Sequence, residues 1–186
     1  MMGLTLFLRE AIIHPSRVGA LFPSSKRLAS DLAEQIPANN PPGLVIELGA
    51  GTGAITAALL HQKSPQYELI IIERSAKLAR HLTQRFPDLT IIQGDARQLL
   101  QLLDSYAAVP IQAIVSSLPL RSLQPDIVQT IGEEISHILK KGGLFIQYTY
   151  SLWGKALAPS QHLKLIHRQW VWQNLPPARI DVFCRE

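Results

Sequence analysis

Apolar and polar positions divide most of the chain into two alternating kinds of segment. Short apolar runs of strand type recur, and stretches with helical spacing of apolar residues lie between them. The pattern predicts strands at 44–48, 67–73, 89–93, 111–116 and 143–149, separated by helices at 53–62, 75–86, 96–104 and 125–139. Because alternating strands and helices form right-handed βαβ units, we predict an α/β protein with a parallel, doubly wound sheet.

The two ends of the chain depart from this alternation. Residues 4–13 are predicted to form a short helix, and a second helix, capped by Ser24 or Ser25, runs to about residue 36. Segments 162–172 and 178–184 are typical of two further strands, which we expect to close the sheet as an antiparallel pair. We therefore predict one domain over 1–186, with a helical cap at 1–40 and the core at 44–186.

The composition indicates a folded protein with a net positive charge, but it does not identify the binding partner. A chain of 186 residues that is 47% hydrophobic is large enough for a full core. The net charge of +4 suits an anionic surface, either nucleic acid or membrane. The single cysteine, Cys184, favours a reducing, cytoplasmic setting. No apolar run reaches the length of a membrane span, and we do not expect the first residues to be a signal peptide.

The most informative motif lies where the first strand meets its helix. It reads Glu47-x-Gly49-x-Gly51-x-Gly53, and glycines at such a turn permit positive φ and a close approach of ligand to backbone. Glu73 follows Gly53 by 20 residues, at the end of the next apolar run. A second parallel strand would present this carboxylate to ribose hydroxyls. The pair predicts a cofactor that contains adenosine.

Two cofactors satisfy the glycine turn. Gly49-x-Gly51-x-x-Ala54 fits the loose dinucleotide pattern, so NAD remains an alternative on the glycines alone. S-adenosylmethionine is favoured by Glu47, which would attract a cationic amino or sulfonium group and repel a pyrophosphate. It is also favoured by Asp95, after the third apolar run, which can accept a hydrogen bond from an adenine amino group. The long segment before the first strand also favours S-adenosylmethionine, because dinucleotide-binding folds often begin with that strand.

Several stretches, which together cover most of the chain, form a recognisable set. They are 19–25 with Leu28-Ala29, 45–53, Ser117–Leu120, 139–143, 147–150 and 174–179. Taken together, they resemble the class I S-adenosylmethionine-dependent methyltransferases and, more narrowly, the bacterial phospholipid N-methyltransferases, which convert phosphatidylethanolamine stepwise to phosphatidylcholine. The resemblance implies a Rossmann-like, seven-stranded, mostly parallel sheet with an antiparallel C-terminal strand and N-terminal helices.

The same subfamily is similar to the rRNA adenine dimethyltransferases, which make an RNA-modifying enzyme the first rival interpretation. Those enzymes carry Asn-Leu-Pro-Tyr or Asn-Leu-Pro-Phe after the fourth strand, where this chain has Ser117-Leu118-Pro119-Leu120. The amide and the stacking ring are both missing, and a lost stacking ring costs about 1–3 kcal/mol per base. A nucleobase acceptor is therefore disfavoured. A small-molecule N-methyltransferase and a catalytically silent binding protein also fit the cofactor motif.

The resemblance and the residues together give a set of candidate site positions. Methyl transfer needs an unprotonated amine about 3 Å from the methyl carbon, in a partly apolar pocket. Tyr148 and Tyr150 share one strand face and can place a ring against a methylated amine. The acceptor residues are predicted to be Ser117, Tyr148 and Tyr150, with Arg179 at a lipid phosphate or exposed on its strand, and no metal. The cofactor contacts are predicted to be Pro23, Ser24, Ser25, Glu47, Gly49, Gly51, Gly53, Glu73, Asp95, Ala96 and Ser116.

Membrane contact has two candidate sources. Residues 4–13 form an apolar stripe followed by basic residues, which is typical of an interfacial helix, although the stripe can equally pack on the core. Trp153, Trp170 and Trp172 can lie at an interface, but large aromatic residues more often serve the core, which is the interpretation we favour. We expect an amine phospholipid substrate and a cytoplasmic enzyme, peripheral at the inner face of the membrane.

Overall fold

The computed structural model describes residues 26–37, 42–61 and 67–186. The predicted helix at 4–13 and the predicted cofactor contacts Pro23, Ser24 and Ser25 lie outside the described residues. The strands, in chain order, are β1 (Gly43–Leu48), β2 (Tyr67–Glu73), β3 (Thr90–Gln93), β4 (Ile111–Ser116), β5 (Leu144–Thr149), β6 (Leu163–Val171) and β7 (Ala178–Arg185). The α-helices are α2 (Lys26–Ala33), α3 (Ala54–His61), α4 (Ala76–Arg85), α5 (Leu99–Leu102) and α6 (Pro125–Ile138).

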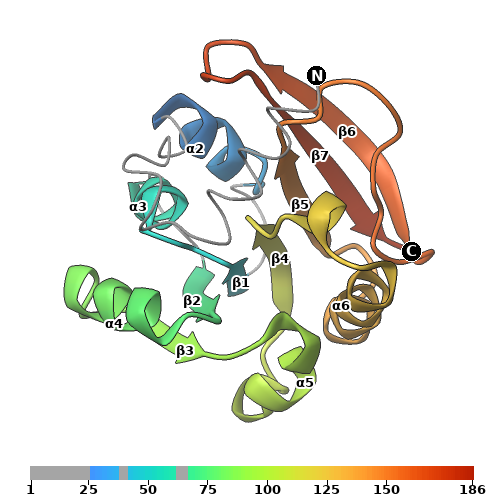
Figure 1. Ribbon diagram of the computed structural model, residues 1–186. Helices are drawn as coiled ribbons and strands as arrows, with labels where there is room; N and C mark the ends of the chain where they lie inside the picture. Colours follow the sequence, from blue (N-terminus) through green and yellow to red (C-terminus); the bar gives the residue numbers. More distant parts are fainter. Residues whose placement is uncertain (1–25, 38–41, 62–66) are drawn as a thin grey trace.

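The seven described strands form one sheet in the order β3-β2-β1-β4-β5-β7-β6. Strands β1 to β5 pair in parallel, and β7 pairs antiparallel with both β5 and β6. The predicted mostly parallel sheet with an antiparallel closing pair is confirmed. Because β6 runs in the same direction as β5, the β6–β7 turn lies at the edge where β4 and β5 end, as the arrowheads in Figure 1 show.

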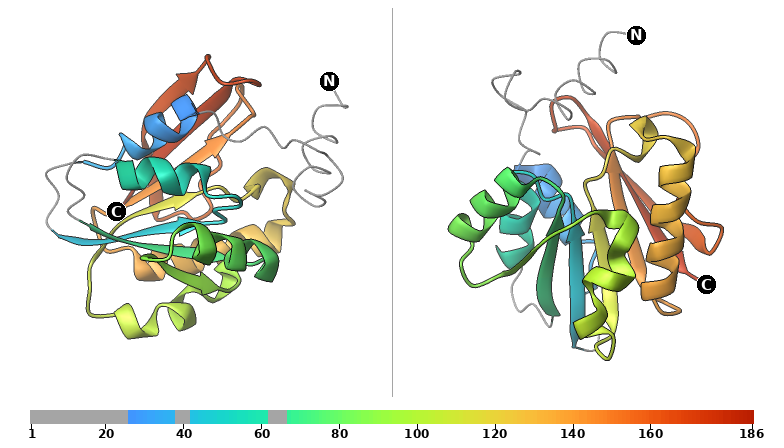
Figure 2. Two further views of the ribbon diagram at one scale, coloured as in Figure 1. Left: turned by 90° about the vertical axis from the view of Figure 1, so that its left-hand side faces the viewer. Right: turned by 60° about the horizontal axis from the view of Figure 1, so that its bottom comes forward.

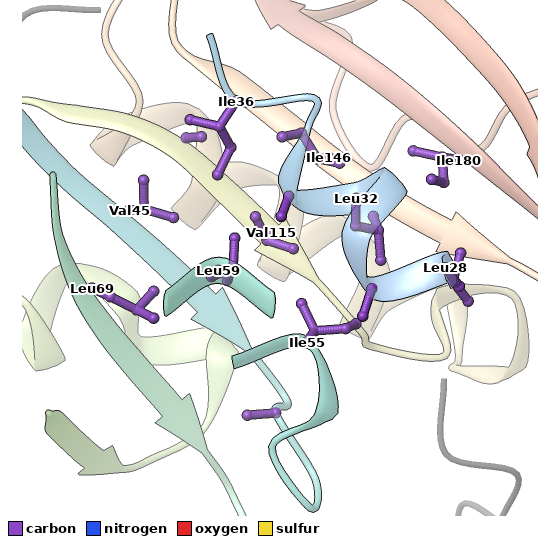
Figure 3. Packing of buried hydrophobic residues seen from close by; sticks show 14 of the residues in the cluster. Leu28, Leu32, Ile36, Val45, Ile55, Leu59, Leu69, Val115, Ile146 and Ile180 are labelled. Atoms are coloured by element: carbon purple, nitrogen blue, oxygen red, sulfur yellow. The ribbon is translucent and has the colours of Figure 1, made fainter. Parts of the chain in front are cut away.

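Helices cover both faces of this sheet (Figure 2), as expected for strands that are apolar on both sides. On one face, Leu28 and Leu32 of α2 and Ile55 and Leu59 of α3 pack over the central strands (Figure 3). On the other face, Ile131 and Ile135 of α6 and Leu99 of α5 pack against the same strands. The two buried layers fix the sheet, and thereby the positions of the strand ends that carry the candidate site.

Most predicted elements are found within about a residue or two of their expected bounds, but one helix is divided. The segment predicted as a helix over 96–104 forms a 3-10 turn at Ala96–Gln98, the short α5, and a second 3-10 turn at Asp104–Tyr106. The Asp95 carboxylate accepts a hydrogen bond from the Arg97 amide, and the Gln98 amide donates to the Asp95 carbonyl three residues back. This capping winds the first turn more tightly than an α-helix.

The interpretation that the tryptophans serve the core is wrong. Trp153 lies in the connection after β5, Trp170 near the end of β6, and Trp172 just beyond β6, and all three are exposed. Among the described residues, no helix is long and apolar enough to cross a membrane.

Candidate functional site

The glycine turn between β1 and α3 has the backbone that the motif predicted. Gly49, Gly51 and Gly53 all have positive φ, at 71°, 58° and 83°. Their surroundings differ. A Cβ on Gly53 would lie 2.5 Å from the Phe86 ring, whereas a Cβ on Gly51 would meet nothing within 4 Å. Gly53 is therefore needed for packing, and Gly51 leaves open space at the turn, where a ligand can approach the backbone.

Glu47 lies near the end of β1, directly before this turn, and its side chain is fully buried. One carboxylate oxygen, Oε2, accepts a 2.7 Å hydrogen bond from the Thr56 hydroxyl, while Oε1 has no partner among the described residues. Burial raises the pKa of Glu47 to about 7, and the neighbouring Glu73 carboxylate contributes to the rise. A buried acid with one open oxygen is suited to a cationic group. Thr56 was missed by the sequence analysis.

Glu73, at the end of β2, is nearly buried and connects two backbone segments. Its Oε2 accepts a hydrogen bond from the Gly51 amide at 3.1 Å, and its Oε1 accepts one from the Ser75 amide at 2.9 Å. An ionised carboxylate has about four lone-pair sites, so about two remain open. This capacity matches the two vicinal hydroxyls of a ribose, and the contact with Gly51 brings the second motif acid to the glycine turn.

Asp95 lies just after β3 and is held by one neighbour. The Arg97 guanidinium donates to Oδ1 at 3.1 Å and to Oδ2 at 2.9 Å, and the Arg97 amide donates to Oδ1 at 3.0 Å. The hydrogen bond from the Arg97 side chain is the main reason that the pKa of Asp95 lies below its usual range. The carboxylate stays ionised with acceptor capacity left on Oδ2. Contacts of Asp95 and the adjacent, buried Ala96 with adenine stay predictions.

These residues fit S-adenosylmethionine better than NAD. The open Oε1 of Glu47, the open space at Gly51 and the remaining acceptor sites of Glu73 together offer a cation site, a backbone approach and a ribose contact. A pyrophosphate at the turn would lie beside a carboxylate instead. When bound, the sulfonium cofactor supplies an activated methyl group.

The predicted acceptor loop follows β4, next to the end of β1. Ser116 is fully buried and accepts a hydrogen bond from the Leu118 amide, while the Ser117 amide donates to the Leu48 carbonyl. The Gln147 side chain, from β5, donates to the Leu118 carbonyl at 3.1 Å. Gln147 therefore fixes the loop from the neighbouring strand. Gln147 was not predicted as a site residue, although its position near the end of a predicted strand was a signal.

Tyr148 and Tyr150 lie together at the end of β5, as their alternation predicted. The rings meet edge to face, with centroids 5.7 Å apart, and both pack partly buried against the α2 side of the core. The side chain of Asn174, in the β6–β7 turn, interacts with the Tyr150 hydroxyl, so the end of β5 lies next to that turn. Burial, with a smaller contribution from Tyr148, raises the pKa of Tyr150 well above its usual range, so its hydroxyl stays protonated.

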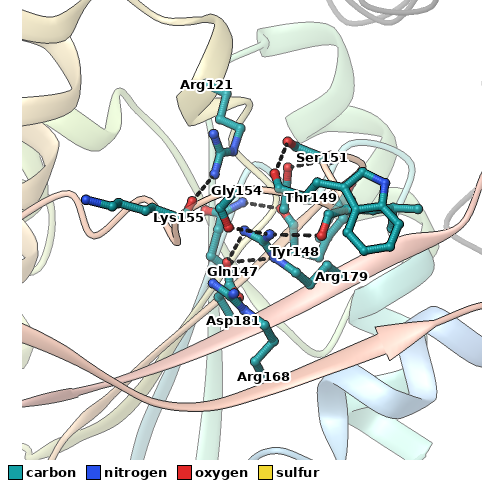
Figure 4. A network of polar contacts seen from close by, with 12 residues as sticks. Arg121, Gln147, Tyr148, Thr149, Ser151, Gly154, Lys155, Arg168, Arg179 and Asp181 are labelled. Atoms are coloured by element: carbon teal, nitrogen blue, oxygen red, sulfur yellow. Dashed lines mark hydrogen bonds and ion pairs between the residues drawn. The ribbon is translucent and has the colours of Figure 1, made fainter.

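Arg179 does not occupy the exposed position considered for it. The side chain is fully buried, and its Nη2 donates to Asp181 Oδ2 at 2.7 Å (Figure 4). Its Nη1 donates to the carbonyls of Leu152 and Gly154, both at 3.2 Å. The guanidinium thus holds the connection after β5, and it presents no exposed surface to a lipid phosphate.

Comparisons with known proteins agree with this geometry. A family described as a methyltransferase domain matches residues 45–143, more than half of the chain. The chain belongs to this methyltransferase family. As a whole, the methyltransferase is 31% identical to an ornithine lipid N-methyltransferase of Singulisphaera acidiphila over 183 residues, which cover 97% of this chain and 94% of the relative. With the site described above, this establishes an S-adenosylmethionine-dependent methyltransferase.

Two further likenesses are more limited, the first in coverage and the second in sequence identity. The methyltransferase is 27% identical to a ribosomal RNA small subunit methyltransferase A of Chlorobium phaeobacteroides over 121 residues, which cover 61% of this chain and 39% of that relative. Among solved structures, the N-methyltransferase NodS of Bradyrhizobium japonicum, in complex with S-adenosyl-L-homocysteine, superposes with a TM-score of 0.68. The two chains are 16% identical, and the match covers 97% of each chain. This likeness shows the fold alone.

Proposed function

We propose that this methyltransferase transfers methyl groups to the primary amine of a membrane lipid headgroup. The observation that carries the proposal is the end-to-end similarity to an ornithine lipid N-methyltransferase, because it spans the acceptor loop and the C-terminal hairpin as well as the cofactor half. The ribosomal RNA relative matches a smaller part of this chain. Phosphatidylethanolamine is the acceptor we propose first, and an ornithine lipid is the alternative within the same class.

The chemistry of the acceptor side supports an amine. A primary amine with a pKa of about 10 must lose its proton before its nitrogen attacks the methyl carbon. As the new C–N bond forms, the C–S bond breaks and its electron pair stays on sulfur. Partly buried surroundings favour a neutral amine, and the partly buried rings of Tyr148 and Tyr150 offer a surface for the cationic product. Repeated transfer needs only that each methylated amine can lose its remaining proton.

The acceptor loop supports a lipid amine over a nucleobase. Leu120 is buried in the α6-side core, so this loop position offers no ring on which a base can stack. Ser117 supplies a hydroxyl where the similar rRNA enzymes carry an amide.

The test is transfer of labelled methyl from S-adenosylmethionine to parallel acceptors. These are vesicles that contain phosphatidylethanolamine, vesicles that contain an ornithine lipid, free ethanolamine, and bulk RNA, with Glu73→Ala as the cofactor-deficient control. Label in either lipid supports the proposal, and the labelled lipid identifies the headgroup. Label only in RNA or only in free ethanolamine would overturn it.

A further inference from the structure

Four large apolar side chains are exposed close together in the C-terminal part of the sheet. Trp153 is 76% exposed, Trp170 40%, Trp172 60% and Leu175 72%. We call these four residues the tryptophan edge. The three tryptophans are all those that the chain contains. Exposed apolar side chains that gather in one place mark a contact with a partner or a membrane more often than scattered ones do.

Hydrogen bonds and strand register bring the tryptophan edge together. Trp170 lies opposite Arg179 on β7, and Arg179 lies opposite Thr149 on β5. The Trp170 indole donates to the Leu152 carbonyl at 3.4 Å, next to Trp153. Trp172 and Leu175 belong to the β6–β7 turn, which returns to Arg179 on the same edge. The connection after β5 and the β6–β7 turn therefore together form the exposed tryptophan edge.

Cationic side chains lie close to the tryptophan edge. Arg121 donates to the carbonyl of Lys155, and Arg168 pairs with Asp181 at 2.7 Å (Figure 4). Arg179 shares the same Asp181 carboxylate, so this group holds four cations and one anion. Arg121 and Lys155 are exposed. Such a surplus of positive charge next to apolar rings complements an anionic lipid surface.

The tryptophan edge lies next to the predicted acceptor residues. Tyr150 lies next to Asn174, within the turn that carries Trp172 and Leu175. The carboxyl ends of β4, β5 and β6 lie along the same border of the sheet (Figure 1). The tryptophan edge and the loop at Ser117 therefore lie at the same end of these strands. A surface held against the tryptophan edge would lie next to the site where the methyl group is transferred.

We propose that the tryptophan edge inserts into the headgroup–acyl boundary of an anionic bilayer and so brings a lipid amine to the acceptor site. Tryptophan suits this boundary because its ring is apolar while its N–H can hydrogen-bond to water or headgroups. Arg121 and Lys155 contact anionic headgroups beside the rings. The inference rests on the proposed lipid substrate, and it names the surface by which the enzyme reaches that substrate.

The native tryptophans make the test direct. Vesicles of phosphatidylglycerol and phosphatidylcholine are titrated into the full-length protein, with bromine atoms placed at shallow or deep acyl positions. We expect a blue-shifted emission that is quenched more strongly by shallow than by deep bromines. Because every tryptophan of the chain lies on the edge, quenching reports insertion of this surface rather than of another segment. Vesicle binding with unquenched emission would overturn the proposal.

Variants then separate the rings from the charges. Trp153→Ala with Trp172→Ala should weaken vesicle binding in a sedimentation assay by about tenfold or more, because two large apolar rings no longer leave water on insertion. Lys155→Gln should weaken binding to anionic vesicles and leave binding to neutral ones unchanged. The matched control is Leu60→Ala, an exposed apolar residue at the end of α3, which should bind as the wild type does. Equal loss in the control would refute the assignment.

The proposal and the proposed function can fail separately. If vesicles quench the tryptophans but no lipid is labelled, the edge binds membranes and the acceptor assignment is wrong. If lipid in detergent micelles is labelled while vesicles leave the emission unchanged, the enzyme methylates lipid and the edge does not insert. Self-association through the edge, seen as a concentration-dependent dimer in sedimentation velocity that Trp172→Ala abolishes, would also overturn the proposal.

Discussion

Replacement of Glu47 by glutamine should stabilise the cofactor-free protein at alkaline pH while weakening cofactor binding. Burial raises the pKa of this carboxyl from 4.5 to about 7. The folded state therefore binds more protons than the unfolded state between these two values, and the free energy of unfolding falls as pH rises through that range. The loss approaches about 3 kcal/mol above pH 7, since each pKa unit corresponds to about 1.4 kcal/mol.

Glutamine removes this pH dependence but retains an acceptor for the Thr56 hydroxyl, which bonds to the carboxylate at 2.7 Å. We expect the difference in unfolding free energy, variant minus wild type, to rise by about 2–3 kcal/mol between about pH 5 and pH 8.5. Urea denaturation without cofactor at the two pH values measures it. Glu68→Gln, which removes an exposed carboxylate on β2, is the matched control. An equal difference at both pH values would refute the assignment of a raised pKa to Glu47.

The same substitution tests the role of the charge. A cation at Oε1 favours ionised Glu47, so affinity for S-adenosylmethionine should increase as pH rises through about 7 in the wild type. Glu47→Gln should lower this affinity by about tenfold or more, because hydrogen bonds to charged groups contribute about 1.5–3 kcal/mol. Isothermal titration calorimetry would show it, and a pH-independent wild-type affinity would contradict the interpretation.

Three further predictions follow from the contacts of the site. Gly53→Ala should lower the free energy of unfolding, measured by urea denaturation, by about 3 kcal/mol, because its Cβ would lie 2.5 Å from Phe86. Gly51→Ala should lower it by only about 1–2 kcal/mol and should mainly reduce cofactor affinity. Equal stabilities of the two variants would contradict this. Glu73→Ala should lower cofactor affinity by about tenfold or more in calorimetry, and unchanged affinity in a folded variant would refute the ribose assignment. Arg179→Ala should destabilise the protein by about 2–3 kcal/mol, because Oδ2 of the buried Asp181 loses its donors while Oδ1 keeps Arg168; a loss below about 1 kcal/mol in denaturation would contradict that.

The cofactor half could be predicted because its signals are local in the sequence. An apolar run that ends in Glu47 and three alternating glycines determines a strand, a turn and a helix start within a few residues. Glu73 was found because consecutive parallel strands end at one edge, which places it next to Gly51. The interaction between Asp95 and Arg97 was missed, although an acid that precedes a helix start is a common capping signal.

The acceptor half was predicted less well because its contacts join distant segments. The environment of Arg179 depends on carbonyls in the connection after β5 and on Asp181, and only the second is near in sequence. Arg179 and Asp181 are two residues apart on one strand, so their shared face was predictable, but burial of that face was not. The prediction for the tryptophans was wrong because Trp153 and Trp172 lie in connecting segments, which run over the surface, and Trp170 lies on the edge strand β6.

The buried ion pair of Arg179 and Asp181 has its main effect on geometry. Burial of two charges costs desolvation free energy, so the pair is weak evidence for stability by itself. Its remaining donors, however, reach Leu152 and Gly154, on either side of Trp153, and hold that connection against β7. Arg179 also lies opposite Thr149 on β5, the residue between Tyr148 and Tyr150. The predicted acceptor side therefore depends on the C-terminal hairpin for its shape, whereas the predicted cofactor contacts Glu47 and Glu73 are positioned by β1 and β2, so the acceptor side can change in this fold without altering the glycine turn.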